Sequence, residues 1–286
     1  MQNPIKDRAA ALMILVYGDD SSDERSERVC AVAGVVGTIM GWRSVERQWL
    51  AITNGIPFHA KDCDSDQGDY KNRPHDENKT LYRDLTVLVA ESHLHGFGIA
   101  INLIALHRVF PDAEDLAYYR AFLRVMEVMK DTAKKNAEIA EFTFDMRMDN
   151  EHNAGLLYGS TRENEPEWAP HLADKISFEF ARKNPRIQVA DLLAREAMKA
   201  LDNQVGPVKR DVRKSWKALR ETGRFEVEAY SDDWFNDLKR QYADLERKVG
   251  FCKQDYVNWL AERNRHHNVT NMFLFVDWFS KRNTNG

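Results

Sequence analysis

The chain has 286 residues, a formal net charge of -4 and the apolar and charged fractions of an ordinary folded protein. This charge excludes a protein that binds nucleic acid over its whole surface, so any basic surface must be local. The three cysteines, Cys30, Cys63 and Cys252, lie far apart, which argues against a zinc ribbon or a disulfide framework. No apolar run is long enough to cross a bilayer, and we expect a cytoplasmic protein that does not engage a membrane.

The first predicted element is a strand over residues 11–18, an apolar run that leads into Asp19 and Asp20 and then into a turn. Residues 29–37, rich in valine and small side chains, predict a second buried strand antiparallel to the first. The elements expected next are a helix over 41–53, a short extended segment over 56–60, a long polar loop over 62–78, a helix from 76 or 77 to 92 and a strand over 96–105.

The second half of the chain continues the alternation of helices and strands. We expect a long helix over 113–135, a strand over 139–146, a short helix over 152–158, an alternating segment over 175–180 and a helix over 187–200. The segments expected after it are helices over 208–220, 231–249 and 254–263 and an aromatic-rich stretch over 269–279.

This order of elements predicts an α/β fold with a mixed sheet flanked by helices. We assign residues 1–205 to a core domain and residues 206–286 to a helical C-terminal extension packed on that core.

Aspartates recur where apolar segments end or are interrupted. Asp19, with Asp20 beside it, follows the first strand, Asp145 ends a later strand, and Asp191 lies within an apolar helical turn. A carboxylate carried by a buried element is costly unless its charge is compensated. Oxygen ligands of this kind can hold two Mg²⁺ or Mn²⁺ ions about 4 Å apart. Each acid also has a structural explanation, as a turn residue, a helix cap or one half of an ion pair.

Four short segments, in this order along the chain, carry a resemblance to a known family. They are Asp19-Asp20-Ser21-Ser22, Phe58-His59-Ala60-Lys61-Asp62, the strand end at Asp145 and Gln188-Val189-Ala190-Asp191-Leu192-Leu193. Over roughly residues 12–200 the chain resembles the domain of unknown function 3800 family. The resemblance implies an RNase H-like fold and a metal-dependent nuclease, or a relative of transposase-type enzymes.

The family motifs carry over to individual positions. Asp19 matches the first acid, Asp20 the glutamate that usually follows it, and Asp191 the late aspartate, while Asp145 matches the central strand acid less closely. The chain departs from the family pattern at two positions, because Asp20 is one methylene shorter than glutamate and Ser22 replaces a glycine. Both departures favour weaker metal binding or a non-catalytic relative.

Two further features bear on function. His59 lies beside the expected site and is a candidate to position a phosphate, act as a general base or ligate metal; its alternative is a hydrogen-bonded structural histidine. Residues 182–224 are rich in lysine and arginine, as a nucleic-acid-binding surface or a solvated helix face would be. The candidate nucleic-acid-binding residues are Lys61, Arg186, Arg195, Lys209, Arg210, Arg213 and Lys214.

The sequence therefore predicts a nuclease that hydrolyses phosphodiester bonds with Mg²⁺ or Mn²⁺, using Asp19, Asp20, Asp145, Asp191 and His59. The alternative is a non-catalytic RNase H-like module that binds nucleic acid or a protein. A third, weaker hypothesis is an assembly protein that uses its aromatic segment over 272–279. The choice between DNA and RNA stays open, as does the oligomeric state, including a homodimer.

Overall fold

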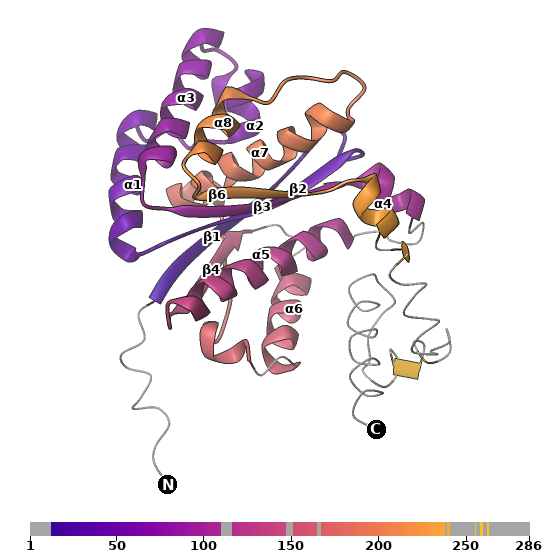
Figure 1. The fold of residues 1–286 in the computed structure, drawn as a ribbon. Helices are drawn as coiled ribbons and strands as arrows, with labels where there is room; N and C mark the ends of the chain where they lie inside the picture. The colour runs from indigo at the N-terminus through magenta and orange to yellow at the C-terminus, as the bar shows by residue number, and fades with distance from the viewer. Residues whose placement is uncertain are drawn as a thin grey trace.

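A mixed six-stranded sheet forms the centre of the molecule, with helices on both of its faces (Figure 1). The computed structural model describes residues 13–109, 116–146, 151–164, 167–237, 239–240, 255, 258–259 and 262. The strands are β1 (Met13–Ser22), β2 (Val29–Gly37), β3 (His95–Asn102), β4 (Ile139–Asp145), β5 (Ser177–Glu179) and β6 (Phe225–Tyr230). Their order across the sheet is β5-β4-β1-β2-β3-β6.

Strand β1 lies inside the sheet, antiparallel to β2 and parallel to β4. Strand β2 is antiparallel to both of its neighbours, whereas β4–β5 and β3–β6 are parallel pairs. Val16 of β1 and Val32 of β2 are fully buried, as expected for strands covered on both faces. The predicted α/β class and the antiparallel start of the sheet are confirmed.

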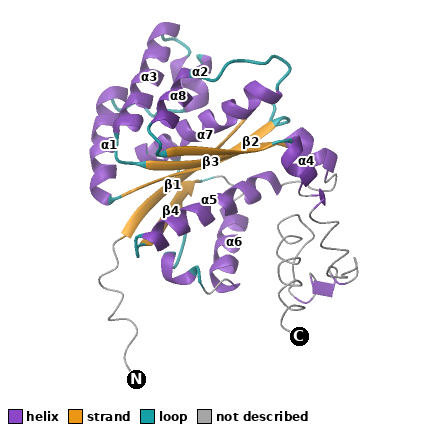
Figure 2. Cartoon of the chain, viewed as in Figure 1, coloured by secondary structure: helices purple, strands orange, loops and turns teal. Residues whose placement is uncertain are grey.

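Two layers of helices cover the sheet, and Figure 2 shows them on opposite faces. One layer contains α1 (Ile39–Thr53), α2 (Ala60–Ser65), α3 (His75–Glu91), α7 (Pro185–Val205) and α8 (Lys214–Glu221). The other side takes core side chains from α4 (Leu103–Val109), α5 (Leu116–Lys135) and α6 (Glu151–Asn164). Short 3-10 helices are η2 (Gly68–Tyr70), η3 (Ala169–His171) and η4 (Ala181–Lys183).

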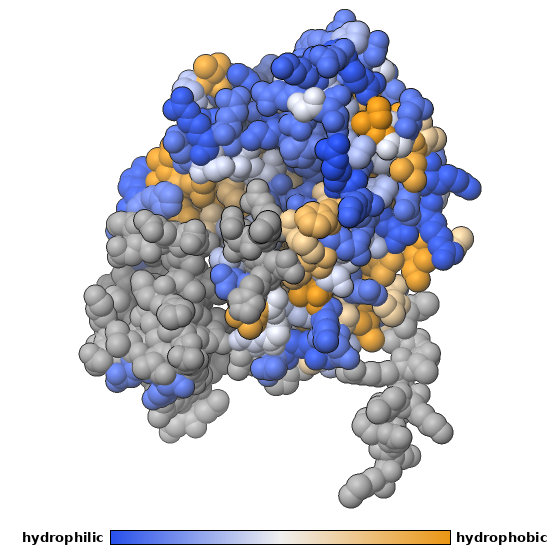
Figure 3. All heavy atoms as spheres, turned by 180° about the vertical axis from the view of Figure 1, so that it is seen from behind, coloured by the Kyte–Doolittle hydropathy of each residue, from blue (hydrophilic) through white to orange (hydrophobic). Residues whose placement is uncertain are grey.

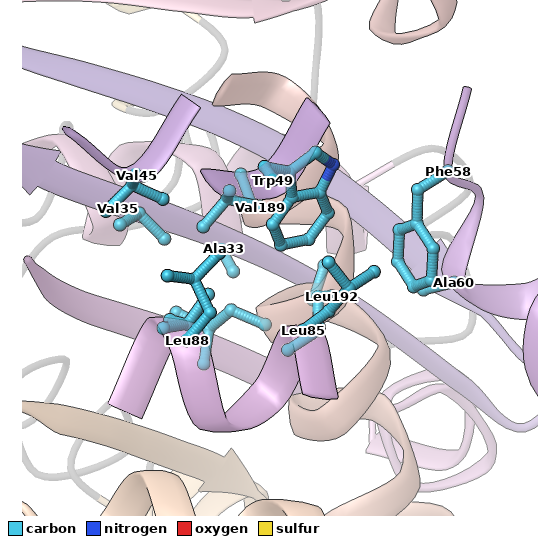
Figure 4. Close-up of a cluster of buried hydrophobic side chains, with 14 of the residues drawn as sticks. Ala33, Val35, Val45, Trp49, Phe58, Ala60, Leu85, Leu88, Val189 and Leu192 are labelled. Carbon is cyan, nitrogen blue, oxygen red and sulfur yellow. The ribbon is translucent and has the colours of Figure 1, made fainter. Parts of the chain in front are cut away.

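Helix α7 packs directly on β1, β2 and β3 and joins the sheet to the outer helices. Figure 4 shows the apolar cluster that results, in which Val35 of β2 lies near Val45 and Trp49 of α1, with Val189 and Leu192 of α7 among them. Trp49 is fully buried. This packing fixes α7, and with it Asp191, over the centre of the sheet.

Strand β1 continues further than its pattern predicted, because Asp19 and Asp20 lie within it and it ends at Ser22. The reversal follows at Asp23, whose buried carboxylate accepts hydrogen bonds from the N–H groups of Arg28 (2.8 Å) and Val29 (3.0 Å). Asp23, rather than the two serines, closes the hairpin, so the ladder to β2 extends past the acids.

The long polar loop predicted over residues 62–78 is wrong. Helices α2 and η2, together with the first turn of α3 from His75, occupy most of it. The buried side chain of Asn78 donates to Asp66 Oδ1 (2.8 Å) and to the carbonyl oxygen of Tyr70 (3.0 Å). These non-local bonds hold short helices that have too little periodicity to be recognised in a sequence.

Three other boundaries differ from the expectations. The strand expected over 96–105 ends at Asn102, whose side chain accepts a hydrogen bond from Ala105 N–H (3.1 Å) and starts α4. The helix expected over 208–220 forms only as α8, because Asn203 binds the backbone of the preceding segment at Arg210 and Asp211. Residues 225–230, within the expected helical extension, form β6 at the edge of the sheet.

Part of the expected C-terminal extension lies outside the described residues. This applies to most of the helices expected over 231–249 and 254–263 and to the whole aromatic segment 269–279. Residues 232–237 and 239–240 are helical.

Candidate functional site

Two neighbouring parallel strands bring Asp19 and Asp145 to the same edge of the sheet. Gly18 of β1 pairs in register with Phe144 of β4, and each aspartate is the next residue of its strand. A methyl group on Gly18 would lie 2.3 Å from the Phe144 ring, so only glycine allows this close approach immediately before Asp19. Residues in register on adjacent strands point to the same face, which places the two carboxylates side by side.

Helix α7 adds the third acid from above the sheet. Asp191 lies on the face of α7 that packs on the strands and is 4% exposed, while Asp19 is 8% exposed. Asp20, half-buried, follows Asp19 on β1. Asp19, Asp145 and Asp191 therefore come together from three elements that are distant in sequence, and Asp20 adds its charge from the position next to Asp19.

Burial and the neighbouring carboxylates both change the pKa values of these acids. Burial raises the pKa of Asp19 well above its usual range, and the carboxylates of Asp191, Asp20 and Asp145 raise it further. Burial also raises the pKa of Asp191 to about 6, with His59 and Arg195 acting in the opposite direction and Asp145 adding to the rise. The site is thus a buried concentration of negative charge, and a bound cation would compensate that charge.

Each acid is also an anchor for the backbone around the site. Asp191 Oδ2 accepts a hydrogen bond from Ala60 N–H (2.7 Å) at the start of α2, and Asp145 Oδ1 accepts one from Ala181 N–H (2.7 Å) at the start of η4. Asp19 Oδ1 accepts from the N–H of Asp20 (2.7 Å). The cap and turn roles considered for these aspartates are therefore real, and they exist together with the carboxylate cluster.

Gln188 joins the two anchored segments one turn before Asp191. Its Oε1 accepts from Trp49 Nε1 (3.0 Å) and Phe58 N–H (3.0 Å), and its Nε2 donates to the carbonyl oxygen of Ala181 (2.9 Å). We did not single out Gln188 as a site residue from the sequence. The sequence feature that could have indicated its importance is its position in the Gln-Val-Ala-Asp motif, three residues before Asp191.

His59 lies next to the site, where it precedes α2. Its Nδ1 is 2.9 Å from Asp62 Oδ2, its side chain is 54% exposed, and its charge acts on Asp191. Lys61 follows on α2 and is half-buried. The structure thus places both residues near Asp191, on the segment whose first N–H group Asp191 holds.

The carboxylates are oxygen donors of the kind that a divalent metal takes. Four carboxylates supply hard oxygen ligands and negative charge, which Mg²⁺ and Mn²⁺ prefer. Within the described part of the chain, however, no three His, Cys, Asp or Glu side chains are placed so as to hold a metal ion. The residues therefore fit the ion in chemistry and charge, while their side-chain positions do not form a complete ligand cage.

The candidate nucleic-acid-binding residues are divided between the interior and the surface. Arg195 and Arg213 both bind the carboxylate of Asp64 (2.9 and 2.8 Å), and the Arg195 side chain is 5% exposed. Arg213 also lies 3.2 Å from the fully buried Glu196. Both arginines thus belong to one ion-pair cluster around Asp64, in which Arg195 is buried and Arg213 keeps part of its side chain exposed.

Among the other candidate cations, Arg186 is half-buried and three lysine and arginine side chains near α8 are exposed. Arg186 binds Glu46 Oε2 (2.8 Å) and donates to the Tyr17 hydroxyl (2.7 Å), at the N-terminal end of α7. Lys209, Arg210 and Lys214 are exposed in or beside the segment between α7 and α8, and Lys209 donates to the carbonyl oxygen of Gln204. The cations predicted to bind nucleic acid therefore have different structural roles, although they lie close together in the sequence.

The chain matches no protein-family model, and a comparison with curated proteins finds no match. Across the part of the chain that the structure describes, no helix has the length and apolar character needed to cross a membrane.

Proposed function

We propose that the protein is a metal-dependent nuclease with an RNase H-like fold. The observation that carries the proposal is the gathering of Asp19, Asp20, Asp145 and Asp191, from β1, β4 and α7, into one cluster whose members raise the pKa of Asp19. Such a cluster of buried negative charge is costly to keep unless it serves a purpose that needs it.

The sheet supports the fold part of the proposal. Its order β5-β4-β1-β2-β3-β6, with β2 as the one antiparallel strand of the six, is compatible with the RNase H-like fold that we propose. The acids also occupy the positions that the resemblance to the domain of unknown function 3800 family implies. Fold analogy alone does not establish chemistry, so the proposal depends on the carboxylates themselves.

In this proposal the four aspartates would hold Mg²⁺ or Mn²⁺. A bound divalent ion supplies activation of water and charge stabilisation at the phosphate. His59, whose ring binds Asp62, would accept a proton or contact a phosphate oxygen, and Lys61 and Arg186 would attract the nucleic-acid backbone. Ala60 and Ala181, bound by Asp191 and Asp145, keep the surrounding segments in register with the acids.

The test is hydrolysis of labelled single-stranded and duplex DNA and RNA with millimolar Mg²⁺ or Mn²⁺ and with chelator. Wild type should cut in the presence of metal, whereas Asp19→Asn and Asp191→Asn should not. The matched control is Asp76→Asn, an exposed aspartate in the first turn of α3, which should cut like wild type. Absence of cleavage by wild type on all four substrates would refute the proposal.

One observation favours a second function, a non-catalytic module that binds nucleic acid. The lack of a complete ligand cage among the described residues, together with the aspartate at position 20, is what a weakened metal site would show. This module would bind oligonucleotides equally well with metal and with chelator and would cut none of them.

A further inference from the structure

Phe180 is an aromatic side chain exposed close to the carboxylate cluster. It follows the edge strand β5 and precedes Ala181, and 49% of its surface is exposed. Two residues earlier, Phe178 packs against the core under the sheet. The alternating pattern of residues 175–180 predicted that both rings lie on one face, but the chain turns into η4 at Phe180 and leaves this ring outside.

Single exposed apolar residues are common and need no explanation by themselves. On the face shown in Figure 3, for example, apolar side chains lie in small groups between hydrophilic ones. Phe180 differs from such residues because of how its backbone is held and which charges surround it.

The backbone around Phe180 is fixed by residues of the candidate site. Ala181 donates its N–H to Asp145 (2.7 Å), and its carbonyl oxygen accepts from Gln188 (2.9 Å). The carbonyl oxygen of Phe180 accepts from Lys183 N–H (2.8 Å). The backbone that carries the ring is therefore held next to the carboxylates, one residue before the N–H group that binds Asp145.

Positive charge accompanies the ring. The ammonium group of Lys183 lies 5.7 Å from the ring centroid, and Arg182, bound to Asp69 (3.0 Å), is exposed beside it. An aromatic face combined with cations is the composition of surfaces that bind single-stranded nucleic acid, where bases stack on rings and phosphates meet lysine or arginine.

We propose that Phe180, with Lys183, forms a stacking site for an unpaired nucleobase next to the phosphodiester group at the carboxylates. The inference rests on the proposed function and narrows its substrate class to single-stranded or locally unpaired nucleic acid. A base in a continuous duplex has no free face to offer this ring, so duplex should gain little from it.

The test is equilibrium binding of labelled single-stranded DNA and RNA. Binding is measured by fluorescence anisotropy in the presence of chelator, so that no cleavage occurs. Phe180→Ala should weaken binding about 5- to 150-fold, since stacking on an aromatic contributes about 1–3 kcal/mol per base. Phe180→Trp should restore it, and binding of duplex should change little. The matched control is Leu156→Ala, which removes a side chain that is 59% exposed on α6 and should have no effect.

Equal affinity of Phe180→Ala and wild type for single strands would overturn the stacking site, as would the absence of single-strand binding by wild type. An equal loss in Leu156→Ala would also overturn it. Cleavage is measured separately: Phe180-dependent binding without metal-dependent cleavage would support this site while refuting the nuclease. Metal-dependent cleavage together with binding that does not depend on Phe180 would support the nuclease and refute the stacking site.

Discussion

Replacing Asp191 by asparagine should stabilise the metal-free protein. Asparagine retains an oxygen that can accept the hydrogen bond from Ala60 N–H, and it removes a negative charge that is buried among Asp19, Asp20 and Asp145. In most proteins a polar substitution in the core is destabilising, so a gain in stability would show that the buried, ionised carboxylate is costly to the native state.

The magnitude follows from the pKa of Asp191, which burial raises from 3.8 to about 6. At about 1.4 kcal/mol for each pKa unit, the ionised carboxylate costs the native state about 3 kcal/mol above pH 6. The new amide must also find hydrogen-bond partners, so we expect a net gain of about 1–3 kcal/mol in the free energy of unfolding.

The pH dependence has a definite sign. Because the native state binds the Asp191 proton more tightly than the unfolded state, wild type loses stability as the pH rises from about 4 to about 6. Asp191→Asn should lack this part of the decline. Urea unfolding in chelator across this range measures both effects. A variant that is less stable than wild type at pH 8, with an unchanged pH profile, would refute the reasoning.

Three further changes test other parts of the structure by urea unfolding. Asp64→Asn should cost about 3–5 kcal/mol, because it leaves the buried Arg195 without its counter-ion; unchanged stability would show that the pair contributes nothing. Gln188→Leu should cost about 2–4 kcal/mol, since it strands two buried N–H donors, and retention of wild-type stability would contradict the bridging role. Gly18→Ala should cost about 1–3 kcal/mol because its methyl group meets the Phe144 ring, and a neutral result would show that the ring moves freely.

Asp64→Asn is expected to lower the free energy of unfolding, whereas Asp191→Asn is expected to raise it, and the difference has a physical reason. Burial raises the pKa of Asp64, but the hydrogen bonds and charges of Arg213 and Arg195 outweigh burial and hold this pKa below its usual value. The stability that Asp64 contributes is thus present at neutral pH and is lost as the pH falls through its native-state pKa. The two residues differ in balance: at Asp64 the arginines outweigh burial, and at Asp191 burial outweighs the partners.

Much of the fold could be predicted from the sequence because apolar periodicity marks long elements. The strands around Val16 and Val32 and helices α1, α3, α5 and α7 were expected close to where they lie. Helix α2 could not be found, because its first N–H group is bound by Asp191, 131 residues away in the sequence. The edge strand β6 was missed for a similar reason, since its support comes from pairing with β3.

The candidate site was predictable only in part. The four aspartates follow apolar segments, a pattern that is visible in one dimension, and the structure brings them together. The sequence did not indicate which of the predicted cations are paired within the protein. Arg195 and Arg213 bind Asp64, and no sequence pattern marks Asp64 as their partner. The exposure of Phe180 likewise depends on where β5 ends.

The most direct test of the central claim is the unfolding temperature of wild type and Asp191→Asn as a function of Mg²⁺ or Mn²⁺ concentration. Metal that binds only the native state raises the free energy of unfolding by about 2.7 kcal/mol at a hundred times its Kd, which corresponds to several degrees in a chain of this size. We predict this rise in wild type and its loss in Asp191→Asn. No rise in wild type with either ion, or an equal rise in both proteins, would contradict a metal site at these carboxylates.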